Sequence, residues 1–207
     1  MGNQFVLRRG LSKVFAAEVL TDEEGGITFG EPFHLIPAGE MTRTTSSESA
    51  NVWYDNTVFD SAGSEGATEV SITGASLRPA DIAKLTGKTV DDATGAIVDD
   101  GDFHPKFFAV GGEAKRTDGT AELFWFLKGT FTAPEESDKT EDESTDTNGM
   151  TLTYSAVKTK HIFNSTGKAC KRVTIDTETT ELVADASWNA QVVTPDNLST
   201  VCKKKNA

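Results

Sequence analysis

Residues 122–127, Glu-Leu-Phe-Trp-Phe-Leu, constrain the fold more than any other part of the chain. In an extended strand, successive side chains point to opposite faces, so Leu123, Trp125 and Leu127 share one face. Phe124 and Phe126 occupy the other face. Because both faces are apolar, both must be covered, which predicts a central strand with a hydrophobic layer on each side.

Other short apolar or alternating runs predict further strands around this one, so the expected fold class is mainly β. They lie at residues 14–20, 33–36, 41–45, 69–73, 103–110, 150–157 and 173–175. A loop with turn residues at Asp118-Gly119 is expected at residues 111–120, between the two strongest strands.

One short α-helix is expected at residues 79–86. Pro79 suits the first helical position, and Asp81 lies in the first turn, where the helix dipole favours a negative charge. Gly87 suits the left-handed position that ends a helix. Ile82 and Leu85 form one narrow apolar stripe, so the helix must gain its stability by packing on a sheet.

Two long polar stretches interrupt the strands and are expected to be extended loops within a single domain spanning residues 1–207. Residues 46–65 are rich in Ser, Asn, Asp and Gly, yet contain Trp53, Tyr54, Val58 and Phe59. Solvated loops rarely expose that much apolar surface, so this segment either folds onto its own domain or packs on a neighbouring molecule. Residues 133–149 carry seven acidic side chains and one lysine, which predicts a solvated loop. The role of residues 177–207 stays open.

The net charge of −12 argues against two classes of partner. Nucleic-acid binding depends on Lys and Arg that neutralise phosphates, and anionic membrane surfaces attract basic segments. Arg8 and Arg9 precede an apolar stretch, but Glu18 interrupts it and acidic residues follow where a signal-peptide cleavage site should lie. We therefore expect a soluble protein made in a cytoplasm, without membrane insertion.

The sequence contains no motif that indicates catalysis, a cofactor or a metal. Phosphate-binding, dinucleotide-binding, nucleophile-elbow and zinc-protease motifs are absent. Paired carboxylates need burial or a partner to shift the pKa of one of them, so Asp91-Asp92 is expected to be solvated, and residues 99–102 are most simply a turn. We therefore predict no catalytic, cofactor-binding or metal-binding site. His34, His104 and His161 are widely separated, and Cys170 and Cys202 lack metal or redox spacing and are expected to be reduced thiols.

The ordered set of segments, more than any single motif, resembles the major tail (tail-tube) proteins of long-tailed, non-contractile bacteriophages of Gram-positive hosts. The resemblance covers residues 10–175 and rests on short pieces at residues 10–19, 29–32, 35–39, 54–56, 66–72, 77–87, 107–112 and 124–129.

The resemblance implies a β-sandwich or β-barrel flanked by one short helix, with self-assembly as the function. Six copies would form a ring whose inner sheets join into a continuous barrel, and stacked rings would form the tube that carries DNA to the host. Partners would be further copies of the chain, the tail initiator, the tail terminator and the tape-measure protein, with DNA only as passing cargo. The aromatic segment of residues 46–65 then becomes a candidate for ring stacking, since aromatic anchors often dominate interfaces.

Two other classes of function remain. The first is a tube subunit of a phage-derived bacteriocin or injection system, whose subunit physics is the same. The second is a monomeric β-sandwich adhesin or carbohydrate-binding module, which would normally carry a secretion signal.

Overall fold

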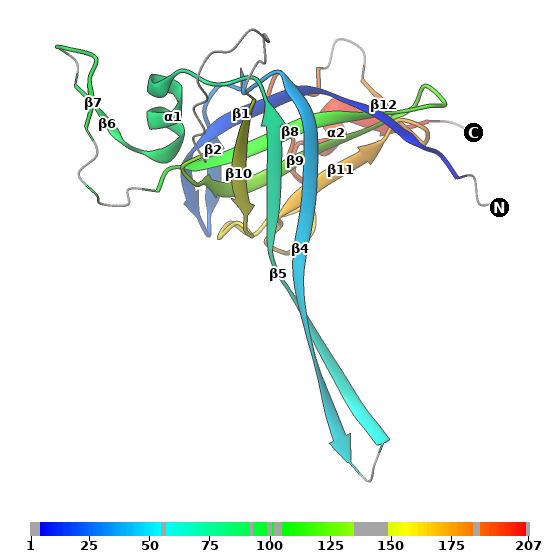
Figure 1. Ribbon diagram of the computed structural model, residues 1–207. Helices are drawn as coiled ribbons and strands as arrows, with labels where there is room; N and C mark the ends of the chain where they lie inside the picture. The colour runs from blue at the N-terminus through cyan, green and yellow to red at the C-terminus, as the bar shows by residue number, and fades with distance from the viewer. Residues whose placement is uncertain are drawn as a thin grey trace, which may run out of the picture.

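The computed structural model describes residues 5–54, 57–91, 93–98, 101, 105–134, 149–183 and 187–205, with only the backbone described for residues 48–64. Within these residues the chain is mainly β, with one large antiparallel sheet (Figure 1). The predicted fold class is therefore confirmed, while the sheet does not close into a barrel within one chain.

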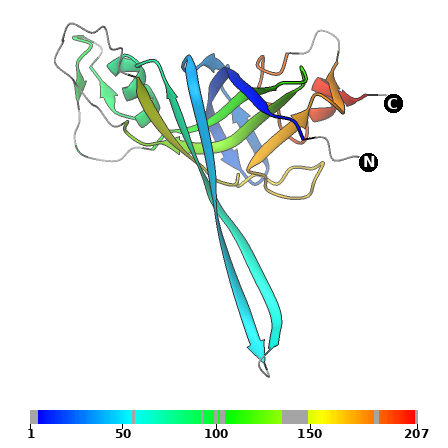
Figure 2. The same cartoon turned by 45° about the vertical axis from the view of Figure 1, so that its right-hand side comes forward.

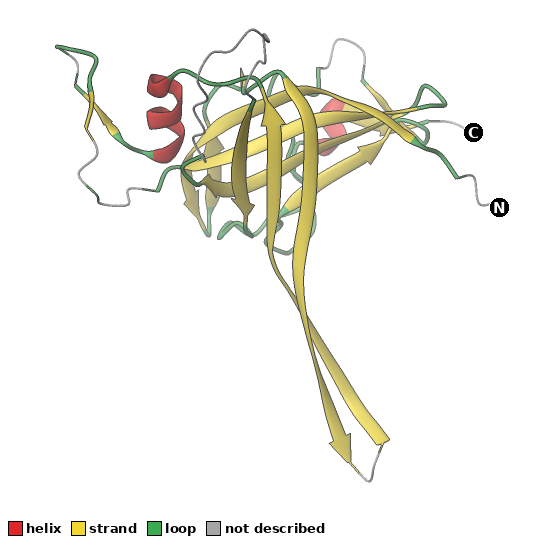
Figure 3. Ribbon diagram, viewed as in Figure 1, coloured by secondary structure: helices red, strands yellow, loops and turns green. Residues whose placement is uncertain are grey.

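The sheet is ordered β2-β1-β8-β9-β10-β5-β4, with β3 beside β1 and β11 beside β9. Its strands are β1 (Arg8–Glu23), β2 (Gly26–Phe29), β3 (Phe33–His34), β4 (Ala38–Tyr54), β5 (Thr57–Gly74), β8 (Phe107–Arg116), β9 (Ala121–Phe131), β10 (Met150–Ala156) and β11 (Arg172–Asp176). In Figure 3 the strands β1, β8 and β9 run across the molecule, while β4, β5 and β10 run steeply across them, so the sheet is strongly twisted.

Strand β9 is central, as its two apolar faces predict. It pairs with β8 on one side, and on the other with β11 along its first half and with β10 along its second half. Phe124 and Phe126 belong to one buried cluster, and Leu123, Trp125 and Leu127 to another on the opposite face. The prediction of two covered faces is confirmed.

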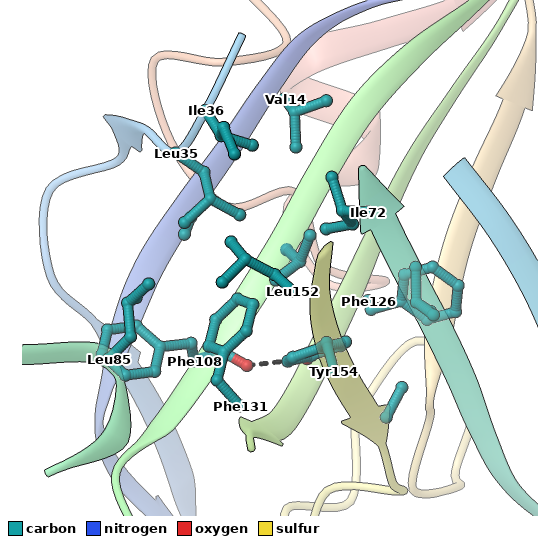
Figure 4. Close-up of a cluster of buried hydrophobic side chains, with 14 of the residues drawn as sticks. Val14, Leu35, Ile36, Ile72, Leu85, Phe108, Phe126, Phe131, Leu152 and Tyr154 are labelled. Atoms are coloured by element: carbon teal, nitrogen blue, oxygen red, sulfur yellow. Dashed lines mark hydrogen bonds between the residues drawn. The ribbon is translucent and has the colours of Figure 1, made fainter. Parts of the chain in front are cut away.

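The first buried cluster lies within the curve of the sheet (Figure 4). Aromatic rings dominate it: the Phe131 ring lies 5.0 Å from that of Tyr154 and 5.7 Å from that of Phe108. The Tyr154 hydroxyl donates a hydrogen bond of 2.8 Å to the Phe108 carbonyl oxygen, so the one polar group of this cluster is satisfied.

The prediction of a loop at residues 111–120 was wrong, because β8 continues to Arg116 and only the tight turn at Asp118-Gly119 connects it to β9. Gly111 and Gly112 pair with Trp125 and Phe124. A Cβ on Gly111 would lie 2.5 Å from the Trp125 ring, so this glycine gives room to an aromatic side chain inside the sheet instead of breaking a strand.

The C-terminal segment covers the second face of the sheet. It contains β12 (Thr180–Leu182), which pairs with β13 (Cys202–Lys204), and the short helix α2 (Leu198–Val201), which the sequence did not predict. Trp188 is buried against Trp125, whose indole N–H donates a 3.0 Å hydrogen bond to the Trp188 carbonyl oxygen. This segment therefore completes the core.

The predicted helix is confirmed as α1 (Pro79–Thr86), with Pro79 in its first turn and Gly87 in the left-handed conformation (φ 77°). Leu85 packs into the first cluster. A small hairpin follows, formed by β6 (Thr89–Val90) and β7 (Ile97–Val98). Among the described residues, no helix is long and apolar enough to cross a membrane.

Candidate assembly interface

The most prominent feature of the molecule is a two-stranded arm, defined as residues 46–66, that projects from the body (Figure 1, Figure 2). Its backbone is a continuation of β4 and β5, not an irregular loop. Pairing runs without another strand from Ser47↔Glu65 to Tyr54↔Thr57. An isolated two-stranded hairpin is only marginally stable in water, so an arm of this length gains from a partner surface.

The four predicted interface residues lie at the tip of this arm. Trp53 pairs with Val58 across the hairpin, Tyr54 is the last residue of β4, and Phe59 follows Val58. Their side chains fall within residues 48–64 and so lie outside what the structure describes. The backbone brings all four together at one end of the molecule.

The root of the arm contains a β-bulge and is bound to the body by a lysine side chain. The strand register shifts between Thr45 and Ser47, and a bulge of this kind bends and twists a hairpin. Lys171, which precedes β11, donates from its Nζ to Glu65 Oε1 at 2.8 Å and to the Gly66 carbonyl oxygen at 3.0 Å. The Lys171 ammonium holds the pKa of Glu65 below its ordinary value. The arm is therefore held where it leaves the sheet.

A pocket of about 280 Å³ lies beside this root, between β5 and β11. We call it the basic pocket; its lining includes Thr45, Glu65, Phe126, Lys158, Lys171 and Arg172. Lys171 is paired with Glu65, and the Arg172 guanidinium carbon lies 5.7 Å from the centre of the Phe126 ring. Glu65 is the one carboxylate in this lining and attracts Lys158 and Arg172 as well as Lys171, so the three cations leave the basic pocket with a net positive charge.

A network of three charged side chains connects three strands of the sheet. Glu122 of β9 accepts hydrogen bonds from Arg43 of β4 at 2.8 Å and from Arg8 of β1 at 2.7 Å. The Arg43 guanidinium also lies 3.8 Å from the centre of the Phe124 ring. Burial raises the pKa of Glu122, but the hydrogen bond and charge of Arg43 outweigh burial and hold that pKa below its ordinary value. This network ties β1, β4 and β9 together.

The outer edge of β4 is the second candidate contact. Among the described residues, β4 pairs with β5 alone, although it has 17 residues. A long unpaired edge presents backbone donors and acceptors that readily add another strand. The opposite edge of the sheet is formed by β2, β3 and the first half of β1, which pairs with β8 alone among the described residues.

Within the part of the chain that the structure describes, the other residues considered do not gather into a metal-binding cluster. The rings of His34 and Phe15 meet edge to face at 5.6 Å, and His161 Nδ1 lies 2.9 Å from the Glu24 carbonyl oxygen. No group of three or more potential ligands gathers among the described residues. His104, Asp92, Asp99, Asp100 and Asp102 lie outside the described residues.

The other polar residues have local structural partners. Asp91 accepts hydrogen bonds from the backbone of Ala93 (3.0 Å) and Thr94 (2.7 Å), which makes it a turn residue. Cys170 and Cys202 are both free, and Cys202 is buried.

Comparison with known proteins identifies the class. The family model for phage tail tube proteins matches residues 43–191, which include the whole arm, the core strands β8 to β11 and Trp188. The chain belongs to the phage tail tube protein family. No curated protein matches the sequence.

Family membership makes the chain a structural component of a phage tail that forms a tube. The match begins and ends later than residues 10–175, on which the resemblance rested. It therefore extends into the C-terminal segment whose role the sequence left open.

Proposed function

We propose that this tail tube protein assembles through its arm and its β4 edge into hexameric rings, and that stacked rings form the conduit for genome delivery. The observation that carries the proposal is the arm, a hairpin that projects from the body without a third strand to support it. A neighbouring copy would supply the missing surface.

The β4 edge supports ring closure. A strand of a neighbouring copy beside β4 would satisfy its free backbone groups and remove an edge that otherwise invites uncontrolled pairing. Repeated around a ring, such pairing would join the open sheets into a continuous barrel, which no single copy forms.

The acidic charge suits a DNA conduit. A wall without excess Lys and Arg avoids the strong affinity for phosphates that counterion release creates, so DNA would pass without binding. We propose three further partners: the tail initiator, the tail terminator and the tape-measure protein. The proposed host is a Gram-positive bacterium, in whose cytoplasm the chain would be made. The proposed tail is non-contractile. The same architecture would also serve a tube in a phage-derived bacteriocin or injection system.

The test uses negative-stain electron microscopy and light scattering on one purified sample across a concentration series. Rings or tubes with a central bore are expected. Particles that remain single at every concentration, even when the tail initiator complex is added, would overturn the proposal in favour of a solitary β-sandwich module.

Trp53→Ala tests the role of the arm. The variant should keep the circular dichroism spectrum of the parent chain while tube formation falls, because Trp53 lies at the arm tip and aromatic anchors dominate interfaces. Ile162→Ala, at a side chain 50% exposed on the body, is the matched control and should assemble normally. Loss of the circular dichroism signal in Trp53→Ala would instead place Trp53 in a core.

A further inference from the structure

We infer that the basic pocket binds the acidic segment of residues 135–148 from a second copy of this chain, the next one in a head-to-tail stack. This inference rests on the proposed tube and names one contact within it.

Charge complementarity identifies the occupant. Residues 135–148 contain Glu135, Glu136, Asp138, Glu141, Asp142, Glu143 and Asp146 against Lys139, a charge of −6 and half of the net charge of the whole chain. The pocket presents Lys158, Lys171 and Arg172 against one carboxylate, Glu65. In a protein of net charge −12, a pocket with a net positive charge favours an acidic ligand.

The size of the pocket suits individual acidic side chains and not a whole peptide segment. Pockets that bury a drug-sized molecule measure roughly 300–1,000 Å³, and this one, at about 280 Å³, lies just below that range. The backbone of the segment would therefore lie outside the pocket while its acidic side chains enter. The aliphatic parts of Lys158 and Arg172 and the Phe126 ring would shield such side chains from water and so strengthen the ion pairs.

The described residues that flank the segment lie at the opposite end of β10 from the pocket. The segment leaves β9 after Phe131 and returns at Met150, which pairs with Gly74 at the end of β5 next to α1. The pocket lies at the other end of β10, where Ala156 pairs with Thr68. At ~3.3 Å per residue, the length of β10 separates the two by about 20 Å.

A second copy is the better source of the segment than the same copy. Fourteen residues that run out and back reach about 23 Å only when fully extended, so binding within one copy would hold the segment taut and cost most of its conformational entropy. In a head-to-tail stack, the end of one copy that carries the segment faces the end of the next copy that carries the pocket. The arm leaves from the pocket end, so both contacts would act at the same junction.

Zero-length carbodiimide cross-linking tests the contact in the intact chain. Equal amounts of ¹⁴N- and ¹⁵N-labelled protein are mixed at high concentration, coupled and analysed by mass spectrometry. Cross-links from Lys158 or Lys171 to carboxylates of residues 135–146 are expected between differently labelled copies, and high salt should weaken them. Cross-links confined to one label, or none at these lysines, would overturn the inference.

A charge exchange gives the second test. The pocket variant is Lys158→Glu/Arg172→Glu, which leaves the Lys171–Glu65 contact intact. The segment variant is Glu141→Lys/Asp142→Lys/Glu143→Lys. In each variant alone, the pocket and the segment of the next copy carry charges of the same sign and repel each other. Cross-links between copies should therefore fall at least about tenfold. An equimolar mixture restores opposite charges and should restore cross-links between positions 158 and 141–143.

Controls separate this inference from the proposed function and from nucleic-acid binding. Lys203→Glu/Lys204→Glu changes the charge equally at a distant strand and should behave as the parent chain. Tubes that form without the cross-links would refute the pocket contact and leave the proposed function intact. Cross-links between copies that form no tubes would refute the proposed function and leave the contact between pocket and segment intact. A labelled DNA duplex that binds the parent chain and not the pocket variant would assign the pocket to DNA and overturn the inference.

Discussion

The body and the arm share the strands β4 and β5, yet different forces hold the two regions. Within the body, Val70 and Ile72 of β5 are fully buried, and β10 pairs with the other side of that strand. Beyond Ser46 and Gly66 the same strands have only each other. The body is therefore stabilised by its own core, while we propose that the arm is stabilised by a neighbouring copy. In this proposal, one hairpin contributes to folding at one end and to assembly at the other.

Trp125→Ala should destabilise the body more than any other substitution considered. Trp125 is fully buried against the C-terminal segment, and its loss removes a large apolar side chain and leaves a cavity. We expect the free energy of unfolding to fall by about 4 kcal/mol, measured by urea denaturation. Ile162→Ala should change it by less than about 0.5 kcal/mol. A loss below about 1 kcal/mol for Trp125→Ala would mean that the C-terminal layer does not close on the sheet.

Local signals predicted the parts of the body in which a few neighbouring residues decide the structure. Pro79 and Gly87 bound α1, and the alternation within residues 122–127 identifies the central strand and both its faces. Gly111 and Gly112 misled the prediction because the reason for them, the rings of Trp125 and Phe124, lies across the strand pair. The burial of Trp188 likewise depends on β9, more than sixty positions earlier in the chain.

The candidate assembly interface was likewise predicted from the sequence only in part. Aromatic residues within a polar stretch indicated that residues 46–65 needed cover, but composition cannot distinguish a hairpin that folds back from one that projects. The basic pocket had no local signal, because its cations come from segments before and within β11 and meet Glu65 of β5 only in the folded sheet. The charge pattern of residues 135–148 predicts a solvated segment but does not predict a surface that would bind it.

Asp22→Asn tests a polar support of the body. Asp22 lies 2.5 Å from Lys128 Nζ and accepts backbone hydrogen bonds from Lys160 and His161, and both side chains of the ion pair are nearly buried. The substitution leaves Lys128 without its counterion, so the free energy of unfolding at neutral pH should fall by about 3 kcal/mol. The exposed pair of Lys106 and Glu18 is the control, and Glu18→Gln should cost less than about 1 kcal/mol.

The effect of Asp22→Asn should depend on pH. Burial raises the pKa of Asp22, but the hydrogen bonds from Lys128 and the two backbone amides outweigh burial and leave that pKa below its ordinary value. A carboxyl group whose pKa is lowered by folding contributes stability that is fully present above about pH 5 and is lost as the pH falls through the folded pKa. The difference in unfolding free energy between the parent chain and Asp22→Asn should therefore shrink in acid. A constant difference down to about pH 2 would show that the ion pair does not form.

Shortening the arm should have the smallest effect on stability and the largest on assembly. Ser47 pairs with Glu65, so an Asn-Gly turn in place of residues 48–64 closes the hairpin while the contact of Lys171 with Glu65 stays in place. The free energy of unfolding should change by less than about 1 kcal/mol, because the removed strands pair only with each other and a shorter loop closes at slightly lower entropic cost. Tubes should no longer form in electron micrographs, although the shortened chain gives the urea transition of the full chain. A fall in stability as large as that of Trp125→Ala would mean that the arm folds as part of the body, and the distinction between the two regions would be lost.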